Sequence, residues 1–367
     1  MIEVAIVDDS AVSRELLAHL LGEDPSIRVA ASLRDGRSAI EYLRGLRDKG
    51  LPLPQVMVMD IVMPAMDGFE ATREIMSSTP IPIIITSSTL DQSSSEKTFR
   101  AMSVGAVAAV QKPPSPASPE YPRKRDELIR LVKSMSKVPV IRRWFKDSGK
   151  AIHPGSEECE KKCREKIPAG GFSVVAVGAS TGGPAALQAL LSDLTKPFPL
   201  PILIVQHIAS GFIQAMADWM SSVTGHAISL AVEGENIQPG RVYLAPDDRH
   251  MTLGRDGRLH LLDQPAEYGQ KPSVGRLFAS VAESVGSRAI GILLTGMGED
   301  GARELGMLRR AGALAVAQGR ESCVVYGMPG AAEKLGSAEY FMSPREIATM
   351  LNRCAGTENI EMLKAEI

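Results

Sequence analysis

The stretch FSVVAVGASTGGP, residues 172–184, determines the fold expected for the C-terminal half of this chain. Its apolar run VVAV, residues 174–177, is typical of a buried parallel strand. Gly182, Gly183 and Pro184 follow, and they allow a sharp turn into a helix whose free N–H groups would face that turn. A strand that passes directly into a helix at such a turn predicts an α/β sheet.

Ser180 lies within this turn, at the place where a catalytic nucleophile would sit. Residues 178–182, GASTG, fit the G-x-S-x-G pattern of a nucleophile elbow. The pattern is short, and a phosphate-binding turn or an ordinary strand-to-helix corner can have the same sequence. Ser180 is therefore a candidate nucleophile that needs a base and an orienting acid from elsewhere in the chain.

Length and composition set the class of protein. A chain of 367 residues with 44% hydrophobic and 23% charged residues is expected to form about two globular domains. The formal net charge of −2 gives no reason to expect nucleic acid or an anionic membrane surface as the main partner. No apolar run is long enough for membrane insertion, and the N-terminal sequence MIEVAIVDDS does not fit a signal peptide, so a cytoplasmic protein is expected.

The cysteines do not predict a disulfide framework, because there are only four in a long chain. Cys159 and Cys163, with His153 nearby, could place metal ligands on one helix face, but zinc sites usually need four protein ligands. Free thiols in a solvated segment are the favoured interpretation. Cys323 and Cys354 are expected to be buried or half-buried.

Strand-like apolar runs separated by amphipathic stretches recur in both halves of the chain, as in α/β domains. They lie at 4–8, 27–32, 55–60, 82–87 and 106–112, and again at 173–178, 201–206, 241–246, 290–295 and 313–317. We predict an N-terminal five-stranded flavodoxin-like domain, closed by a helix at 126–135, and a C-terminal doubly wound, mostly parallel α/β domain with a hairpin turning at 255–257. The expected boundaries are 1–137 for the first domain, 138–171 for a linker, 172–355 for the second domain and 356–367 for a polar tail.

Polar side chains follow four strands of the first predicted sheet, at the point where each strand ends. Asp8 and Asp9 follow the first strand, Asp60 the third, Ser87 the fourth and Lys112 the fifth. The carboxyl ends of parallel strands meet at one crevice, so we expect these residues to lie together. Three neighbouring carboxylates need a hard cation to offset their repulsion, and Mg²⁺ suits such oxygen ligands. The cation would also offset the charge of a phosphoryl group on Asp60.

The segments that carry these residues, VDDS, MDIVMPAMDG, TSS and QKP, resemble the receiver domain of two-component systems over residues 1–137. The resemblance implies that Asp60 accepts a phosphoryl group from a histidine kinase while Asp8, Asp9 and Asp60 hold Mg²⁺. It also implies that Ser87 is the switch hydroxyl and that Lys112 contacts the phosphoryl group. The bond between Lys112 and Pro113 is expected to be cis.

A base and an acid for Ser180 should lie at the same edge of the second sheet. The strand at 201–206 ends directly in His207, and the strand at 290–295 leads through a short glycine-rich turn to Asp300. Ser180, His207 and Asp300 therefore each follow a predicted parallel strand, and one crevice could collect all three. His250 is the main competitor to His207 as the base.

The glycines near Asp300 allow a different interpretation. TGMGEDG, residues 295–301, fits the G-x-G-x-x-G pattern between a strand and a helix, as a dinucleotide site would. Glu321 stands at about the right interval for the ribose-binding acid, but no second strand clearly ends in it. The alternative function is thus a response regulator whose output domain binds a partner or a nucleotide without catalysis.

The order of the candidate residues, Ser then His then Asp, differs from the Ser–Asp–His order of α/β hydrolases and argues against that fold. The second half instead is similar to the catalytic domain of chemotaxis-specific protein-glutamate methylesterases. The matching segments are VGASTGGP, IVQH, VYLAP with DRH, KPSV, LLTGMGEDGA, and AQ followed by VVYGMPGAA, which span residues 172–333.

This second resemblance implies a triad of Ser180, His207 and Asp300 that needs no cofactor. The implied substrates are γ-glutamyl methyl esters on the cytoplasmic helices of chemoreceptors, which lose methanol, and receptor glutamines, which are deamidated. Backbone N–H groups near Thr181 and Met297 are the expected oxyanion donors. Thr181 could instead be only a helix cap, and the Met297 side chain could simply line the pocket. The receiver is expected to inhibit the esterase until Asp60 is phosphorylated.

Three positions depart from the pattern of this family. Asp247 stands where glycine is common, Gly275 stands where aspartate is common, and QGRES, residues 318–322, replaces a more acidic stretch. All three lie beside the expected crevice, so they bear on pocket shape and receptor preference.

Overall fold

A computed structural model describes residues 1–88, 92–138, 168 and 171–355 of the chain. The chain forms two compact units, Met1–Lys146 and Asp147–Ile367, and each is described by itself. Most of the segment predicted as a linker lies outside the described residues, and so do Cys159 and Cys163. The predicted polar tail, 356–367, lies outside them as well.

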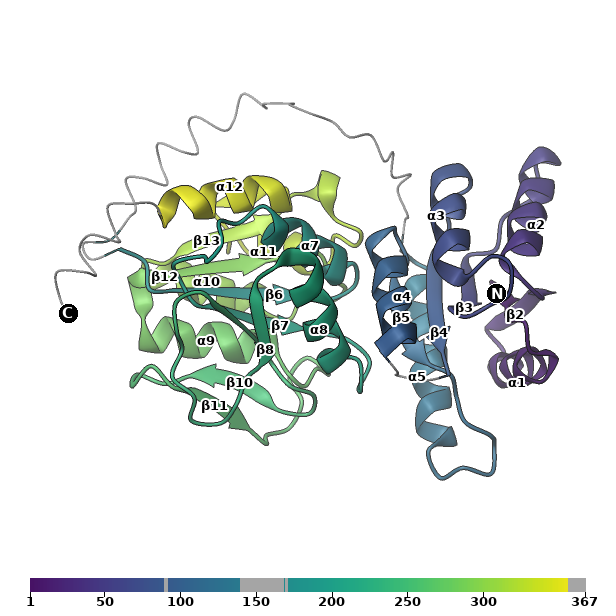
Figure 1. The fold of residues 1–367 in the computed structure, drawn as a ribbon, viewed down its shortest axis with the longest axis horizontal. Coiled ribbons are helices and arrows are strands. Elements are labelled where there is room, and N and C mark those ends of the chain that lie inside the picture. Colours follow the sequence, from purple (N-terminus) through teal and green to yellow (C-terminus); the bar gives the residue numbers. More distant parts are fainter. Residues whose placement is uncertain (89–91, 139–167, 169–170, 356–367) are drawn as a thin grey trace. The chain divides into compact units, whose positions relative to one another are not determined.

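The first unit is a five-stranded parallel sheet with helices between successive strands (Figure 1). Its strand order, β2-β1-β3-β4-β5, is that of the predicted flavodoxin-like receiver fold. Its elements are β1 Ile2–Val7, α1 Ala11–Gly22, β2 Ile27–Leu33, α2 Gly36–Asp48, β3 Val56–Asp60, α3 Gly68–Ser78, β4 Ile83–Ser87, α4 Gln92–Ser103, β5 Ala108–Gln111 and α5 Tyr121–Met135.

Local sequence explains where these elements begin. Strands β3 and β4 are buried along their whole length, as continuous apolar runs in a parallel sheet should be. The side chains of Ser10, Asp35 and Asp67 cap the N-termini of α1, α2 and α3. Helix α5 begins at Tyr121, five residues before the predicted start at 126, because Pro122 is well tolerated in the first turn of a helix.

The second unit is a seven-stranded parallel sheet in the order β14-β13-β12-β6-β7-β9-β8, with a separate antiparallel hairpin of β10 and β11. Its strands are β6 Val174–Ala179, β7 Ile202–Gln206, β8 Ala227–Leu230, β9 Arg241–Leu244, β10 His250–Leu253, β11 Leu259–Leu262, β12 Ala289–Leu293, β13 Leu314–Gln318 and β14 Tyr340–Met342. Its α-helices are α7 Gly183–Ser192, α8 Ile213–Thr224, α9 Val274–Ser284, α10 Ala302–Arg310, α11 Met328–Lys334 and α12 Pro344–Cys354.

The first strand of this sheet, β6, lies between β7 and β12. The chain builds outward from β6 in one direction through β7 and then returns to its other side at β12. Such a reversal places a ligand crevice at the carboxyl ends of the strands concerned. The predicted doubly wound α/β fold is therefore confirmed, and β6, β7 and β12 mark where the site should lie.

Two edge strands, β8 and β14, were not expected from the sequence. They are only four and three residues long, and their residues are mostly half-exposed. Short edge strands lack the continuous apolar run that identifies a buried strand, so the sequence gives little signal for them.

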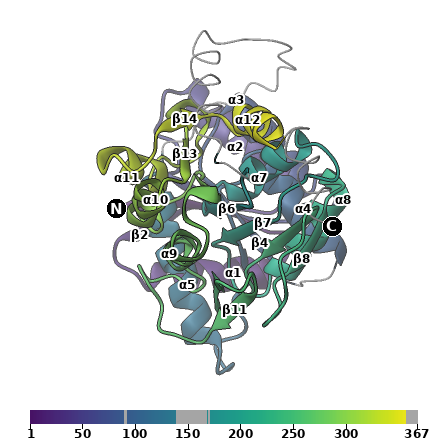
Figure 2. The same cartoon turned by 90° about the vertical axis from the view of Figure 1, so that its left-hand side faces the viewer.

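Helices cover both faces of the seven-stranded sheet. Figure 2 shows α7, α8 and α12 on one side of the strands and α9, α10 and α11 on the other. Fully buried apolar side chains on the second side, among them Leu203, Tyr243 and Phe278, form a continuous core with α9, α10 and α11. This packing fixes the strand ends from which the functional residues project.

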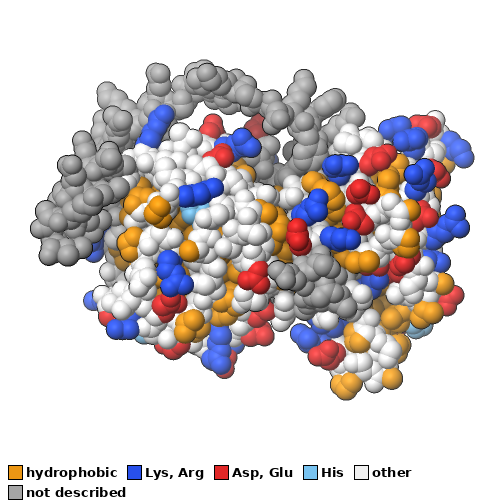
Figure 3. All heavy atoms as spheres, viewed as in Figure 1, with side chains coloured by type: hydrophobic (Ala, Val, Ile, Leu, Met, Phe, Trp, Pro, Cys, Tyr) orange, Lys and Arg blue, Asp and Glu red, His pale blue; other side chains and the backbone are white. Residues whose placement is uncertain are grey.

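The described surface carries charges of both signs. Basic and acidic side chains are interspersed on the visible face of each unit (Figure 3). Among the described residues, no helix has the length and apolarity needed to cross a membrane. Cys323 and Cys354 are free thiols and both are buried, within the range expected for them.

One backbone prediction was wrong. The structure has cis peptide bonds at Lys196–Pro197 and Lys271–Pro272, whereas the bond between Lys112 and Pro113 is trans. A trans bond is the favoured state before proline, and with it the Lys112 ammonium still reaches the acidic crevice.

Candidate functional site

Ser180 follows directly after β6, in the tight turn that leads to α7. Its N–H donates to the Thr295 carbonyl at 3.0 Å, and its own carbonyl accepts from the Gly183 N–H at 2.8 Å. A Cβ on Gly296 would lie 2.7 Å from the Ser180 Cβ, so only glycine allows the neighbouring turn to approach this closely. Ser180 is 9% exposed, which leaves the side chain largely shielded but not sealed off.

His207 follows directly after β7, and hydrogen bonds connect it to the end of β6 and, through Gln206, to Ser180. The His207 N–H donates to the Ala179 carbonyl at 2.9 Å. The Gln206 amide Nε2 donates to the Ser180 carbonyl at 2.9 Å and to the His207 carbonyl at 2.7 Å. One buried side chain therefore fixes the backbone of the candidate nucleophile to that of the candidate base.

Asp300 lies between His207 and the first residues of α9. Its Oδ2 is 3.0 Å from the His207 Nε2, although the ring N–H does not point along the line of a hydrogen bond. Its Oδ1 accepts from Ser273 Oγ and from the Gly275 N–H, both at 2.9 Å, and its Oδ2 accepts from the Val274 N–H at 2.8 Å. Every lone-pair direction of this carboxylate thus faces a donor or the imidazole.

These partners control the ionisation of Asp300. Burial by itself would raise the pKa of the carboxyl, but the neighbouring His207 and the N–H groups of Gly275 and Val274 lower it below its ordinary value. Asp300 is consequently ionised at neutral pH. An ionised carboxylate at 3.0 Å would stabilise a charged imidazole at His207.

Ser180 and His207 are brought together, but no hydrogen bond from Ser180 Oγ to the imidazole occurs among the described residues. Because Nε2 of His207 faces Asp300, Nδ1 is the ring nitrogen left for Ser180. Such bonds are often absent without substrate and form when the complex is assembled.

His250, the competing base, has a structural role. It is fully buried, its Nδ1 accepts from the Ser273 N–H at 3.2 Å, and its Nε2 lies 3.0 Å from the Pro265 carbonyl. Both ring nitrogens are therefore engaged, which leaves neither free to take a proton from Ser180. His250 instead holds the segment that supports Asp300.

The two predicted oxyanion donors lie in the turns on either side of Ser180. The N–H groups of Thr181 and Met297 have no hydrogen-bond partner within the described part of the chain, whereas the Thr181 carbonyl accepts from Thr295 Oγ1 at 3.0 Å. Gly182, rather than Thr181, is the N-cap of α7. Met297 is 41% exposed, so its side chain reaches the surface beside the site.

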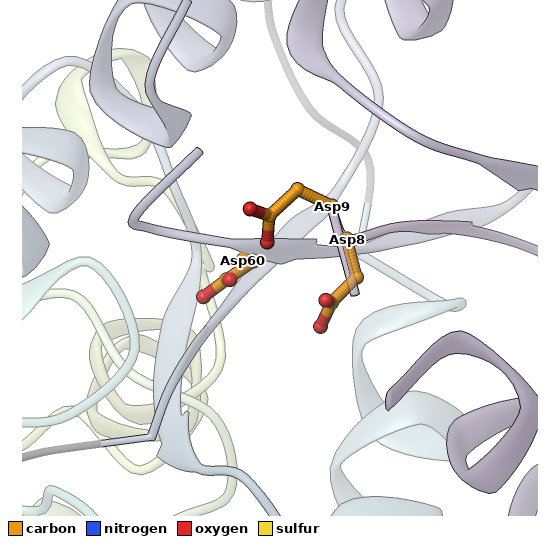
Figure 4. A group of neighbouring side chains, drawn as sticks. All are labelled: Asp8, Asp9 and Asp60. Atoms are coloured by element: carbon orange, nitrogen blue, oxygen red, sulfur yellow. The ribbon is translucent and has the colours of Figure 1, made fainter. Parts of the chain in front are cut away.

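The first unit gathers its five predicted residues at the carboxyl edge of its sheet. Oxygens of Asp8, Asp9 and Asp60 all lie within 4.8 Å of one another (Figure 4). The Lys112 Nζ lies 2.8 Å from an Asp8 oxygen and 2.7 Å from an Asp60 oxygen. Ser87 is buried at the end of β4. Three carboxylates at this spacing are a suitable oxygen donor set for Mg²⁺.

The surroundings of Asp60 disfavour the ionised form of its carboxyl group. Burial raises the pKa of Asp60, Lys112 lowers it, and Asp8 raises it, with a net increase above the ordinary value. For Lys112, burial acts to lower the pKa, but the bonds to Asp60 and Asp8 outweigh it and raise the pKa. Lys112 is therefore positively charged at neutral pH, and its ammonium group pairs with both Asp8 and Asp60.

Comparisons with known proteins support the family resemblance predicted for each half of the chain. Residues 175–351 match the family model described as CheB methylesterase, and residues 4–118 match the response regulator receiver domain. A protein-glutamate methylesterase/protein-glutamine glutaminase from Syntrophus aciditrophicus is 45% identical over 97% of this chain and 99% of its own length. A relative of the same name from Geobacter metallireducens is 43% identical over 97% of this chain and 99% of its own.

The chain belongs to the protein-glutamate methylesterase/protein-glutamine glutaminase family. Among solved structures, the catalytic domain of the Thermotoga maritima CheB methylesterase is 34% identical, with a TM-score of 0.48 over 50% of this chain and 98% of that one.

Within this methylesterase family member, the glycine pattern at 296–301 has a local explanation. Gly296 packs against Ser180, and Gly301 has a left-handed φ of 80° where it caps α10. A Cβ on Gly301 would lie 3.0 Å from the Val274 Cβ. The glycines therefore let the Asp300 turn pack closely against its neighbours, without requiring a nucleotide.

Two of the three departures from the family's sequence pattern, Asp247 and Gly275, contact segments next to the candidate triad. The Asp247 Oδ2 accepts from the Gly211 N–H at 2.7 Å, in the loop after His207. A Cβ on Gly275 would lie 3.2 Å from an Asp300 oxygen and 3.0 Å from an oxygen of Glu304. The sequence motifs thus contain the candidate residues Ser180, His207 and Asp300, whereas supporting residues such as Gln206 and Ser273 gave no separate signal.

Proposed function

We propose that this chain hydrolyses γ-glutamyl methyl esters on chemoreceptor helices, releasing methanol, and deamidates receptor glutamines by the same acyl chemistry. The observation that carries the proposal is the convergence of Ser180, His207 and Asp300 on three neighbouring strand ends, with 3.0 Å between His207 Nε2 and Asp300 Oδ2. Family membership supports the same reaction class, since relatives carry the name of this double activity.

In the proposed reaction, His207 Nδ1 takes the Ser180 proton while the hydroxyl oxygen attacks the ester carbonyl. The N–H groups of Thr181 and Met297 bind the oxyanion. The proton on His207 passes to the departing methoxy group, and methanol leaves an acyl-enzyme on Ser180. Water, deprotonated by His207, then hydrolyses that acyl-enzyme. With a glutamine side chain, ammonia leaves in place of methanol.

Methanol release from a methylated receptor fragment tests this proposal. Ser180→Ala should reduce the rate by several orders of magnitude, as removal of a serine nucleophile does elsewhere. Ser222→Ala, a serine on α8 that bonds only the Trp219 carbonyl, is the matched control and should retain full activity. Equal rates in Ser180→Ala and the wild-type chain would refute the proposal and favour a non-catalytic output domain.

We further propose that a chemotaxis histidine kinase phosphorylates Asp60 and that this activates the esterase in the cytoplasm. Asp8, Asp9 and Asp60 would hold Mg²⁺, which offsets charge on the incoming phosphoryl group, while Lys112 and Ser87 bind the phosphoryl oxygens. A receiver over 1–137, a linker over 138–171 and a catalytic domain over 172–355 would transmit the change, with the unphosphorylated receiver inhibitory.

A small phosphodonor such as acetyl phosphate tests the regulation. It should raise the esterase rate of the wild-type chain in the presence of Mg²⁺ and leave Asp60→Asn at its basal rate. Control through Asp60 would be disproved if acetyl phosphate also raised the esterase rate of Asp60→Asn. It would be disproved as well if the wild-type chain had basal activity that acetyl phosphate did not raise.

A further inference from the structure

A strained tyrosine lies in the loop between β11 and α9. Glu267 and Gln270 exchange backbone hydrogen bonds of 3.0 and 2.8 Å, which closes a two-residue turn. Both central residues, Tyr268 and Gly269, have left-handed backbone angles, with φ of 51° and 74°. This is the pattern of a type I′ turn, which strongly favours asparagine, aspartate or glycine at both positions.

Tyr268 is an unfavourable choice at this position. A bulky side chain with positive φ is an outlier, because its Cβ crowds the backbone. The turn nevertheless keeps its shape, since Arg276 pairs with Glu267 at 2.7 Å and Lys271 pairs with Asp263 at 2.6 Å. Tyr268 also remains 47% exposed, so burial of the ring does not compensate for the strain. Strain of this kind concentrates at functional sites.

The Tyr268 hydroxyl contacts Glu304, an acid that lies near Asp300. It donates to Glu304 Oε1 at 3.4 Å, a weak bond that still orients the ring. The other oxygen of Glu304 and one oxygen of Asp300 lie 3.0 and 3.2 Å from the same point, the Cβ position missing on Gly275. Because Gly275 has no side chain, Glu304 can lie beside Asp300 and connect the tyrosine to it.

Nearby acids also act on the Tyr268 phenol. Partial burial raises the pKa of the Tyr268 phenol, and the charges of Glu304, Asp300 and Glu299 raise it further. The hydroxyl therefore stays protonated as a donor at neutral pH. Tyr268 is thus a half-exposed residue close to the acids that neighbour Asp300.

We infer that Tyr268 is a substrate-positioning residue, whose exposed ring packs against the apolar side chains of the receptor helix that carries the ester. The inference rests on the proposed function, because it assumes a helical protein substrate at Ser180. A tyrosine that is held at its hydroxyl contributes a large contact area at little cost in side-chain entropy, which is why tyrosines are frequent binding hot spots. A small ester lacks the helix side chains that this contact would need.

Tyr268→Asn is the decisive variant, because asparagine keeps the type I′ turn and removes the ring. For a methylated receptor fragment we expect KM to rise about tenfold with kcat nearly unchanged, the loss typical of an interface anchor. For the γ-methyl ester of N-acetylglutamate amide, kcat/KM should stay within about twofold of wild type. The midpoint of thermal unfolding should not fall, because the strain is relieved. Tyr268→Phe, which keeps the ring, should lie close to wild type on both substrates.

Leu335→Asn is the matched control, since Leu335 is an apolar residue that is 61% exposed at the end of α11. It should change neither substrate's kinetics. Equal losses on both substrates in Tyr268→Asn would overturn the inference and assign Tyr268 a purely structural role. An unchanged KM for the receptor fragment would overturn it as well.

A binding measurement separates this inference from the proposed reaction. In the Ser180→Ala background, where no turnover is expected, Tyr268→Asn should raise the Kd for the same receptor fragment about tenfold by calorimetry. If the wild-type chain released no methanol but Tyr268→Asn still raised the Kd, the proposed esterase reaction would be refuted and the contact with Tyr268 would stand. A Kd that does not change would refute the contact alone.

Discussion

Asp60 is a buried acid whose surroundings oppose its own charge. The Lys112 ammonium at 2.7 Å offsets only part of the effect of burial and of Asp8, so the pKa stays raised. Because the negative charge of Asp60 is unfavourable in these surroundings, any event that offsets this charge is favoured. Binding of a cation to the three carboxylates would be such an event.

This raised pKa predicts a pH-dependent effect on stability. The folded state binds the Asp60 proton more tightly than the unfolded state, so the stability contributed by this group falls as pH rises through the folded pKa. Asp60→Asn removes the charge and should raise the unfolding midpoint of the first unit by a few degrees at about pH 7. The gain should shrink as the pH approaches the ordinary carboxyl value of 3.8.

Thermal unfolding followed by circular dichroism at a series of pH values checks this expectation. Asp48→Asn, which alters an exposed acid at the end of α2, serves as the control and should show no comparable gain. A gain from Asp60→Asn that is independent of pH would mean that the charge of Asp60 is not its cause.

At the scale of elements, the site depends on how the ends of β6 and β7 are joined. Gln206 bonds the carbonyls of both Ser180 and His207 from within the sheet edge. The Asp300 carboxylate is held in the same way by the start of α9, through Ser273, Val274 and Gly275. The candidate residues are thus placed by backbone that is itself fixed, as the proposed catalysis would require.

Gln206→Leu should weaken this connection without altering the substrate surface. The His207 carbonyl loses the Gln206 amide donor and the Ser180 carbonyl keeps only the Gly183 N–H, at an expected cost of about 1–3 kcal/mol in unfolding free energy. The kcat should fall by roughly an order of magnitude or more while KM changes little, because misplaced groups lose transition-state stabilisation. Denaturant unfolding and steady-state kinetics measure the two effects.

Gln214→Leu provides the comparison, since Gln214 is exposed on α8 and bonds only Asp218. It should leave both quantities near their wild-type values. An increase in KM at constant kcat for Gln206→Leu would show that Gln206 acts in substrate binding instead.

The sequence was informative where one physical constraint dominates. Buried parallel strands need continuous apolar runs, and the residues that follow them share one edge, so Ser180, His207 and Asp300 could be identified as a set. The strands β8 and β14 gave no such pattern because they are short edge strands.

Supporting contacts between distant segments left no periodic signal in the sequence. Gln206 resembles any polar residue at a strand end, and the fully buried His250 resembles a candidate base. Only the structure shows that the first donates to two carbonyls and that both ring nitrogens of the second are engaged. Tyr268 likewise shows its strain only through φ, which a sequence does not record.

At the scale of the whole molecule, the chain combines two sheets that place their candidate functional residues at the same edge. In both units these residues follow the carboxyl ends of parallel strands, at a place where the strand order reverses. One edge collects acids suited to a cation and a phosphoryl group, and the other collects a hydroxyl, an imidazole and a carboxylate.

Magnesium should therefore act on one unit only. At a concentration of about one hundred times its Kd, a bound ion stabilises its unit by about 2.7 kcal/mol. Differential scanning calorimetry of the full chain should show the transition of the first unit moving to higher temperature with Mg²⁺, while that of the second stays in place. Asp9→Asn should abolish the shift, whereas Asp48→Asn should preserve it. A shift shared by both transitions would contradict a site confined to Asp8, Asp9 and Asp60.

The strand order of the second unit also limits when activity can arise during synthesis on the ribosome. Strand β6, which leads to Ser180, pairs with β7 on one side and with β12 on the other. A nascent chain that has emerged only as far as β11 contains Ser180 and His207 but lacks Asp300, and one edge of β6 has no partner. Such an intermediate exposes backbone donors and acceptors to other chains. We therefore expect the proposed site to be completed late in synthesis, when β12 pairs with β6.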